Sequence, residues 1–298
     1  MYFSSELELY DIIGQNIKYY RNIQNITQQT LAERSQLSLS YISKVEAKNC
    51  DKSLSIYALN QIANALGIDI SLFFKEVQPN MKLETAKAKI SKLANIPFSK
   101  YLTADQLQGI TINKGKSGQL LELTIGLKLS NTTLDFEDGE LKTNKCDSSG
   151  TPKETMFITQ IASMIDELLE EKEFKYTKLY KKLQHLLYVP ISKDGEPQDW
   201  MFLPCIEIDL SLAKYSELAK QLESDYYSIC KQMNQQLQMS STATLHTVNG
   251  KFIQIRTKDS KPYTPIYSEK YKRFISDKNR AFYFKKEFMH YIVNLEKH

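Results

Sequence analysis

The hydrophobic pattern of this 298-residue chain changes its period once, and that change most constrains the fold. Residues 5–75 place apolar side chains at the spacing of several short helices. From about residue 110, short alternating or apolar runs typical of strands are mixed with helical stretches. Residues 78–80, Gln-Pro-Asn, break the pattern in between. The sequence therefore predicts an all-α domain at residues 1–78, followed at residues 79–298 by an α/β (α+β) domain with a mixed central sheet.

The second domain is expected to combine short strands with longer helices. Strands are expected at residues 134–143, 156–159, 186–191, 202–210 and 252–256. Helices are expected at residues 82–93, 118–129, 161–171 and 211–237. No internal repeat or low-complexity segment interrupts this order.

The composition is that of an ordinary globular protein, because 42% of the residues are hydrophobic and 25% are charged. The apolar runs are shorter than the roughly 18 residues of a membrane helix, and the acidic start is unlike a secretory signal. The cysteines form no CxxC pair, so free thiols in a reducing compartment are expected. They are Cys50, Cys146, Cys205 and Cys230. We therefore expect a cytoplasmic protein with no membrane partner.

Positive charge gathers in the second domain. Residues 1–78 hold 7 basic and 8 acidic side chains, whereas the remainder holds 32 and 27. The segment 270–286 alone carries seven basic residues and one acid, with aromatic residues between them. Such a segment can neutralise phosphates while its aromatic rings anchor it, which favours a nucleic-acid partner over a merely solvated basic face.

Residues 26–46 carry the pattern of two short helices joined by a tight turn. Thr27 is placed to cap the first helix and Ser38 the second, with the turn at residues 35–37. The side chains expected to face inward are Leu31, Ala32, Ile42 and Val45. The polar residues between them then face outward, where a second helix of this kind can enter the major groove.

Residues 9–74 resemble the Cro/repressor-type (XRE-like) helix-turn-helix family, on the runs 26–35, 37–46 and 58–67. Family members often have glycine in the turn, where this chain has Gln36, so we expect a strained or reshaped turn. The resemblance implies double-stranded DNA as partner, with contacts to phosphates and bases. The DNA-binding residues that it implies are Gln28, Ser38, Ser40, Tyr41, Ser43 and Lys44. The alternative is a helical bundle used for protein contact or dimerisation.

A second set of motifs recurs in order along the rest of the chain. The blocks span residues 114–122, 134–136, 139–143, 147–157, 182–190, 250–256 and 281–286. Together they resemble the MutH family, which comprises the strand-nicking mismatch-repair endonuclease and related type II restriction enzymes. The resemblance covers residues 105–290 and implies a restriction-endonuclease-like domain of the PD-(D/E)xK class.

Hydrolysis of a phosphodiester needs an activated water and charge neutralisation, and Mg²⁺ prefers carboxylate, water and phosphate oxygens. Glu140 and Lys142 alternate along a predicted strand, so both should point to one face. The resemblance implies Asp135 and Glu140 as Mg²⁺ ligands, with Lys142 beside the attacking water. It also implies supporting roles for Glu122 and Lys182 at the active site. A lone Glu-x-Lys would more often be an exposed ion pair on a strand.

Two acids complicate this assignment. Only five residues separate Asp135 from Glu140, fewer than in the repair enzyme, so Glu137 and Asp138 compete for the first ligand position. Glu154 matches a further acid of the family, for which we expect a supporting role.

The resemblance also assigns residues to sequence recognition. Arg256 corresponds to a family arginine that contacts a base, expected to be guanine, through a bidentate fork. Tyr283 corresponds to a tyrosine near the adenine where methylation is sensed, although a buried core aromatic is an equal alternative. Lys285 and Lys286 are expected near the substrate or its phosphates.

Two function hypotheses follow. The first is a type II restriction endonuclease with a GATC-like palindromic site, expected to act as a homodimer on DNA, whose first domain adds DNA affinity or represses its own operon. The second is a transcription regulator whose nuclease-fold domain does not cut. A strand-directed repair nickase is a third, weaker hypothesis. The histidines show no i, i+4 pair and the chain has no GxxxxGK[ST] loop, which disfavours a zinc protease and a nucleotide hydrolase.

Overall fold

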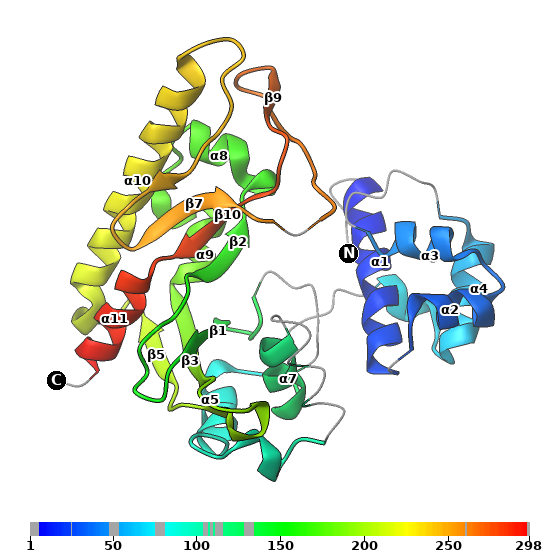
Figure 1. Cartoon of the computed structure of the whole chain (residues 1–298). Coiled ribbons are helices and arrows are strands. Elements are labelled where there is room, and N and C mark those ends of the chain that lie inside the picture. The colour runs from blue at the N-terminus through cyan, green and yellow to red at the C-terminus, as the bar shows by residue number, and fades with distance from the viewer. Residues whose placement is uncertain are drawn as a thin grey trace. The chain divides into compact units, whose positions relative to one another are not determined.

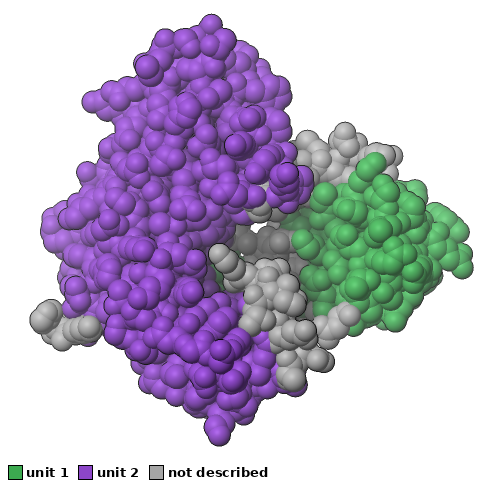
Figure 2. Space-filling view, in the orientation of Figure 1, with its two compact units in different colours: residues 1–80, 122–135 green, residues 81–121, 136–298 purple. Residues whose placement is uncertain are grey.

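The computed structural model describes residues 6–24, 26–47, 54–74, 81–103, 107, 110, 116–127, 134–259 and 261–296. The chain divides into two compact units, Met1–Asn80 with Glu122–Asp135, and Met81–Leu121 with Phe136–His298 (Figures 1 and 2). The predicted break at residues 78–80 and the motif residues 114–115 lie outside the described residues. The domain boundary between residues 78 and 79 therefore stays a prediction.

The first unit contains a small bundle of helices. Its helices are α1 (Glu6–Ile23), α2 (Gln28–Ser35), α3 (Leu39–Val45), α4 (Ile56–Leu66) and a 3₁₀ turn at Ile70–Phe74. Thr27 and Ser38 accept hydrogen bonds from the backbone amides of Thr30 and Tyr41, as expected of N-caps. The predicted inward residues of α2 and α3 are all buried in one core with α1 and α4. The helix-turn-helix arrangement is thus confirmed.

The second unit mixes strands and helices. Its strands are β1 (Glu140–Cys146), β2 (Met156–Gln160), β3 (His185–Ser192), β4 (Met201–Phe202), β5 (Ile206–Asp209), β6 (Val248–Asn249), β7 (Ile253–Thr257), β8 (Ile266–Ser268), β9 (Arg273–Ser276) and β10 (Arg280–Phe284). Its α-helices are α5 (Leu83–Ser91), α8 (Ile165–Leu169), α9 (Lys178–Leu183), α10 (Ser216–Gln238) and α11 (Lys286–Leu295), while α7 (Lys116–Thr124) extends across the division.

Two sheets organise the second unit. In the first, β1 and β3 are parallel, whereas β4 and β5 pair with β3 in the antiparallel sense. The second sheet is antiparallel with the order β2-β10-β7-β6, and β8 and β9 form a separate hairpin. The predicted mixed α/β region is confirmed. None of the described helices is both long and apolar enough to cross a membrane.

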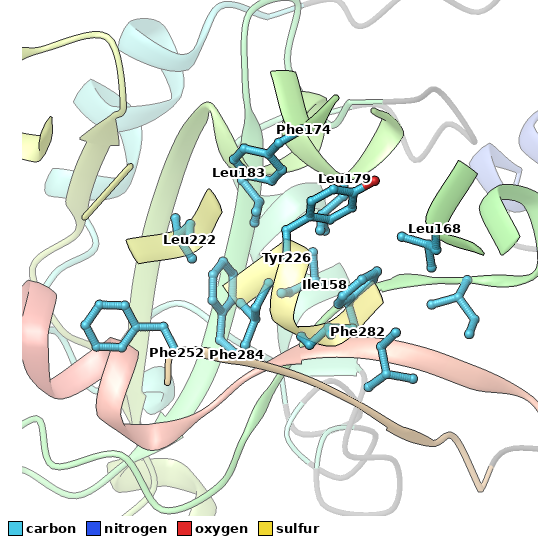
Figure 3. Close-up of a cluster of buried hydrophobic side chains, with 14 of the residues drawn as sticks. Ile158, Leu168, Phe174, Leu179, Leu183, Leu222, Tyr226, Phe252, Phe282 and Phe284 are labelled. Atoms are coloured by element: carbon cyan, nitrogen blue, oxygen red, sulfur yellow. The ribbon is translucent and has the colours of Figure 1, made fainter. Parts of the chain in front are cut away.

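A large apolar core joins the second sheet to α8, α9 and α10. Figure 3 shows Leu222 and Tyr226 of α10 facing Phe282 and Phe284 of β10 within this cluster. α10 runs alongside β6 and β7 (Figure 1). Because α10 has 23 residues, it provides a long buried face, against which the antiparallel sheet packs. Polar and aromatic side chains occupy the sheet face opposite α10.

The strand expected at residues 202–210 is two separate strands, β4 and β5, and two further expected elements were also wrong. The strand expected at residues 134–143 begins only at Glu140, because a turn precedes it in which the Phe136 amide donates to the Gly139 carbonyl at 2.9 Å. The helix expected at residues 161–171 is a 3₁₀ turn followed by the short α8. Both errors come from local turn hydrogen bonds that a hydrophobic pattern does not reveal. The described cysteines Cys146, Cys205 and Cys230 are free, and Cys50 lies outside the described residues.

A buried carboxylate fixes the start of β7. Asp225 of α10 is 3% exposed and accepts hydrogen bonds from the backbone amides of Lys251, Phe252 and Ile253 at 2.8, 2.6 and 3.1 Å. Gly250 is required beside it, since a Cβ there would lie 2.4 Å from the Asp225 carboxyl carbon. This contact explains why the block 250–256 begins with glycine.

Replacing Asp225 with alanine should destabilise the second unit by about 3 kcal/mol, because it leaves buried amides without acceptors. Urea unfolding at neutral pH measures this loss. Glu223→Ala, on an exposed position of the same helix, is the matched control and should change stability by less than about 0.5 kcal/mol. Equal stability of the two variants would contradict the structural role of Asp225.

Candidate active site

The strand β1 carries the acid and the lysine that the sequence singled out. Because side chains alternate along a strand, Glu140 and Lys142 share one face, while Leu141 between them is buried on the other. Lys142 Nζ donates a hydrogen bond to Glu140 Oε1 at 2.5 Å. The predicted proximity of these two side chains is therefore observed.

A second ammonium reaches the same carboxylate from α9. Lys182 Nζ lies 2.8 Å from Glu140 Oε1 and 2.9 Å from Oε2. Helix α9 is capped by Thr177, and its Leu179 and Leu183 are buried in the core, which fixes the helix next to β3. Lys182 was found through the family resemblance alone, and only the fold brings it to β1.

The resulting cluster is enclosed and carries excess positive charge. The side chain of Glu140 is 3% exposed, and those of Lys142 and Lys182 are 10% and 17% exposed. One carboxylate thus faces two ammonium groups in a site with little water, where charge–charge interactions are stronger than at the surface. Such a site attracts an anion such as a phosphate group.

Glu122 and Asp135 are assigned to the first compact unit. Glu122 lies in α7 and Asp135 lies in the turn that precedes β1, and each is half-buried. Their predicted roles beside Glu140 stay predictions. Among the competing acids, Asp138 is engaged elsewhere, because its Oδ1 accepts from the backbone amide of Leu83 at the start of α5 at 2.8 Å. Glu137 is exposed.

The donor set near Glu140 is compatible with a hard cation. Among the described residues no group of three or more His, Cys, Asp or Glu side chains gathers to hold a metal ion. Mg²⁺, however, is often held by one or two carboxylates, with waters and substrate phosphates as the other ligands. Glu140 with one further acid fits that requirement, whereas a zinc cage of His and Cys does not.

The predicted base-reading residues meet on the second sheet. Arg256 of β7 and Tyr283 of β10 are adjacent, with the guanidinium carbon 4.7 Å from the centre of the tyrosine ring. The hydroxyl of Thr155 accepts a hydrogen bond from Arg256 Nη1 at 3.2 Å. Tyr283 is half-buried rather than a core residue, and burial raises the pKa of its hydroxyl.

Several basic side chains of the segment 270–286 have hydrogen-bond partners within the fold. They donate to backbone carbonyls: Lys270 to Leu169, Arg273 to Leu237 and Ala243, Arg280 to Leu245, and Lys285 to Gly250. Lys286 at the start of α11 is exposed. The expectation that this segment can neutralise phosphates stays a prediction, since charge counts do not show which of its cations also have carbonyl partners.

In the helix-turn-helix, the proposed recognition residues lie at the surface. Ser38, Ser40, Ser43 and Lys44 are exposed, and Tyr41 is half-buried. Gln36 adopts a left-handed conformation with φ 57°, so the turn keeps the geometry for which glycine is usually chosen.

A buried ion pair, which the sequence analysis missed, joins α1 to the end of α3. Arg21 donates to both carboxylate oxygens of Glu46, at 2.6 and 2.7 Å, and to the Ile26 carbonyl at 2.9 Å. Gln28, expected to contact phosphate, donates to Glu46 Oε2 at 2.8 Å. Glu46 therefore holds the side chain of Gln28 at the start of α2. No local signal in the sequence marks this pair, because 25 residues separate its two members.

The fold defines a helix-turn-helix domain followed by a mixed α/β domain, and family models match both. The model of the helix-turn-helix family matches residues 17–73, and that of the DNA mismatch repair enzyme MutH matches residues 127–201. The chain is 34% identical over 64 residues to the control protein C.SmaI of Serratia marcescens, which covers 22% of this chain and 74% of that protein. It is 41% identical over 64 residues to the immunity repressor of Bacillus phage phi105, over 22% of this chain and 43% of the repressor.

Among solved structures, the restriction-modification controller protein C.AhdI from Aeromonas hydrophila matches with 29% identity and a TM-score of 0.21, over 22% of this chain and 96% of that one. The chain belongs to the helix-turn-helix family through its N-terminal domain and carries a MutH-family domain in its C-terminal region. The MutH match includes Asp135, Glu140, Lys142 and Lys182. It ends before Arg256 and Tyr283, whose roles rest on the sequence blocks alone.

Replacing Glu46 with glutamine should loosen the first unit, because Arg21 loses its charged partner in a buried position. The expected cost of about 3 kcal/mol corresponds to a roughly 100-fold faster amide exchange in α1 and α3. Hydrogen exchange followed by mass spectrometry measures it. Glu33→Gln changes an exposed acid of α2 and should leave exchange unaffected; similar exchange in both variants would refute the proposed role of the pair.

Proposed function

We propose that this protein is a Mg²⁺-dependent type II restriction endonuclease that hydrolyses phosphodiester bonds at a short palindrome, with GATC as the first candidate. The observation that carries the proposal is the enclosed cluster of Glu140, Lys142 and Lys182. Buried charges in such a group are costly to the fold, and a domain without catalytic use for them gains stability by losing them. The MutH-family match over this segment adds independent support.

In the proposed hydrolysis, each residue of the site has a separate role. Glu140 and Asp135 would hold Mg²⁺, which when bound acts as a Lewis acid towards the phosphate. Lys142, next to Glu140, orients the attacking water and neutralises charge that develops on the phosphate oxygens. Lys182 adds a second positive charge from the other side of the carboxylate, and Glu122 supports the site. Glu140 would share its oxygens between the cation and the two lysines.

Recognition of the site would use the second sheet. In this proposal Arg256 contacts a guanine edge, Tyr283 lies near the adenine, and Lys285 and Lys286 lie near the backbone phosphates. A domain with one active site cuts one strand at a time, so double-strand cleavage of a palindrome calls for two copies on the DNA.

The helix-turn-helix domain has two possible uses in a restriction enzyme. It can add DNA affinity near the cleavage site, or it can repress the operon that encodes the enzyme. The relative C.SmaI is named a control protein, which favours the regulatory use. The likeness to a control protein also supports the second candidate function, a transcription regulator whose nuclease-type domain does not cut.

Cleavage of a plasmid of known sequence separates these functions. The native chain should linearise or nick the plasmid with Mg²⁺ and lose this activity in excess EDTA, and mapping of the ends identifies the site. Lys142→Ala should lower the cleavage rate by at least about 100-fold, because it removes a charge next to the reacting phosphate. Lys145→Ala, at an exposed position of the same strand, should cut normally.

If the native chain binds DNA but leaves every plasmid intact across divalent metals, the regulator is the correct function. A Lys142→Ala variant that cuts as fast as the native chain would remove Lys142 from the mechanism.

The first domain can be tested separately from cleavage. Lys44→Ala should weaken binding to the upstream region of its own gene by about tenfold and reduce the salt dependence of binding, because one phosphate or base contact is lost. Its cleavage rate at the mapped site should stay within about twofold if the domain is regulatory. Electrophoretic mobility shifts give the affinity, and Lys18→Ala on the exposed face of α1 is the control. A loss of cleavage in Lys44→Ala would show instead that the domain delivers the enzyme to its site.

A further inference from the structure

We propose that Thr155 is a positioning residue for sequence recognition, and that its hydroxyl sets the plane in which Arg256 presents its guanidinium to a base. This inference rests on the proposed function and adds a residue to it. Its starting point is the hydrogen bond from Arg256 Nη1 to Thr155 Oγ1 at 3.2 Å. Neither the sequence blocks nor the family match assigned a role to Thr155.

The guanidinium is held by two contacts of different kinds. Tyr283 covers one face, 4.7 Å from the guanidinium carbon, and the Tyr283 ring is itself braced edge-on by Phe157 with 5.7 Å between ring centres. Contact with the Tyr283 ring alone would let the planar guanidinium rotate above the ring. The hydrogen bond to Thr155 stops that rotation. Because arginine has five N–H donors, this bond leaves a donor pair for a bidentate contact with a base.

Thr155 can act as a fixed point because its loop is tied to β1. The buried amide of Asn144 donates to the Glu154 carbonyl at 3.1 Å, and the Lys153 amide donates to the Lys145 carbonyl at 2.9 Å. Farther along the loop, Asp147 accepts from the backbone amides of Ser149 and Thr151 at 3.0 and 2.9 Å. The loop 147–155 is therefore anchored to the strand that bears Glu140 and Lys142.

The energetic consequence is specific. A bidentate arginine contact favours the correct over an incorrect base by roughly 5- to 150-fold, and the contact needs the guanidinium plane aligned with the base edge. Without the hydroxyl, the arginine samples other orientations above Tyr283 and keeps its charge. It then binds any sequence almost as before but loses part of its preference for one base pair.

The test compares kcat/KM at the mapped site with kcat/KM at duplexes that differ from it by one base pair, using the full chain. Thr155→Val removes the hydroxyl and keeps the shape of the side chain, and it should lower the ratio at one base-pair position by about tenfold. Thr155→Ser keeps the hydroxyl and should restore the ratio to within about threefold. Thr159→Val, a half-buried threonine in β2, is the matched control and should keep the native ratio.

A merely structural role would lower kcat/KM on all duplexes and leave their ratio unchanged. A double-mutant cycle adds an independent readout: in an Arg256→Ala background, Thr155→Val should have no further effect on the ratio. An unchanged ratio in Thr155→Val, or an equal loss in the Arg256→Ala background, overturns the positioning role while leaving the endonuclease function intact. A native chain that cuts without any sequence preference overturns both this inference and the proposed site specificity, and a native chain that does not cut overturns the endonuclease function itself.

Discussion

One carboxylate between two ammonium groups is the interaction on which this structure's chemistry depends. Glu140 is almost fully enclosed and receives hydrogen bonds from Lys142 and Lys182. An isolated buried carboxylate would be costly, and here two cations offset that cost while leaving a net positive charge. The same excess of positive charge favours an anion such as a phosphate as a further partner. In the proposed function, stability and chemistry therefore depend on the same three side chains.

The two sheets hold the functional side chains of the second unit in place. The parallel pair β1 and β3 places Glu140 and Lys142 on one face, and the short α9, held by its buried leucines, delivers Lys182. The antiparallel sheet packs on α10 and carries Arg256 on β7, whose start Asp225 anchors, and Tyr283 on the neighbouring β10. The loop 147–155 connects β1 to β2, so the acid–lysine cluster and the arginine–tyrosine pair belong to one continuous scaffold.

In the first unit, too, a buried carboxylate is paired with a cation. The Arg21–Glu46 pair fixes α1 to the end of α3 and holds Gln28 at the surface. Gln36 takes a left-handed conformation without glycine. The hydrogen bonds of its amide to the Ala32 and Glu33 carbonyls, and of the Leu37 amide to the Ala32 carbonyl, support this conformation. A residue that departs from the family pattern is thus accommodated by backbone bonding, and the helix-turn-helix geometry persists.

The sequence by itself determined the order of the two domains, the caps Thr27 and Ser38, the inward residues of α2 and α3, and the shared face of Glu140 and Lys142. All of these depend on the period of a helix or a strand, or on hydrogen bonds between near neighbours, so they can be read locally. The tertiary structure alone decided that β1 begins after the turn at Phe136–Gly139 and which basic residues of the segment 270–286 bond to carbonyls. It also decided that Lys182 meets Glu140 across 42 residues and Arg256 meets Thr155 across 101. Such contacts join segments far apart in the chain, and no local pattern records which distant groups will satisfy a buried charge or a free donor.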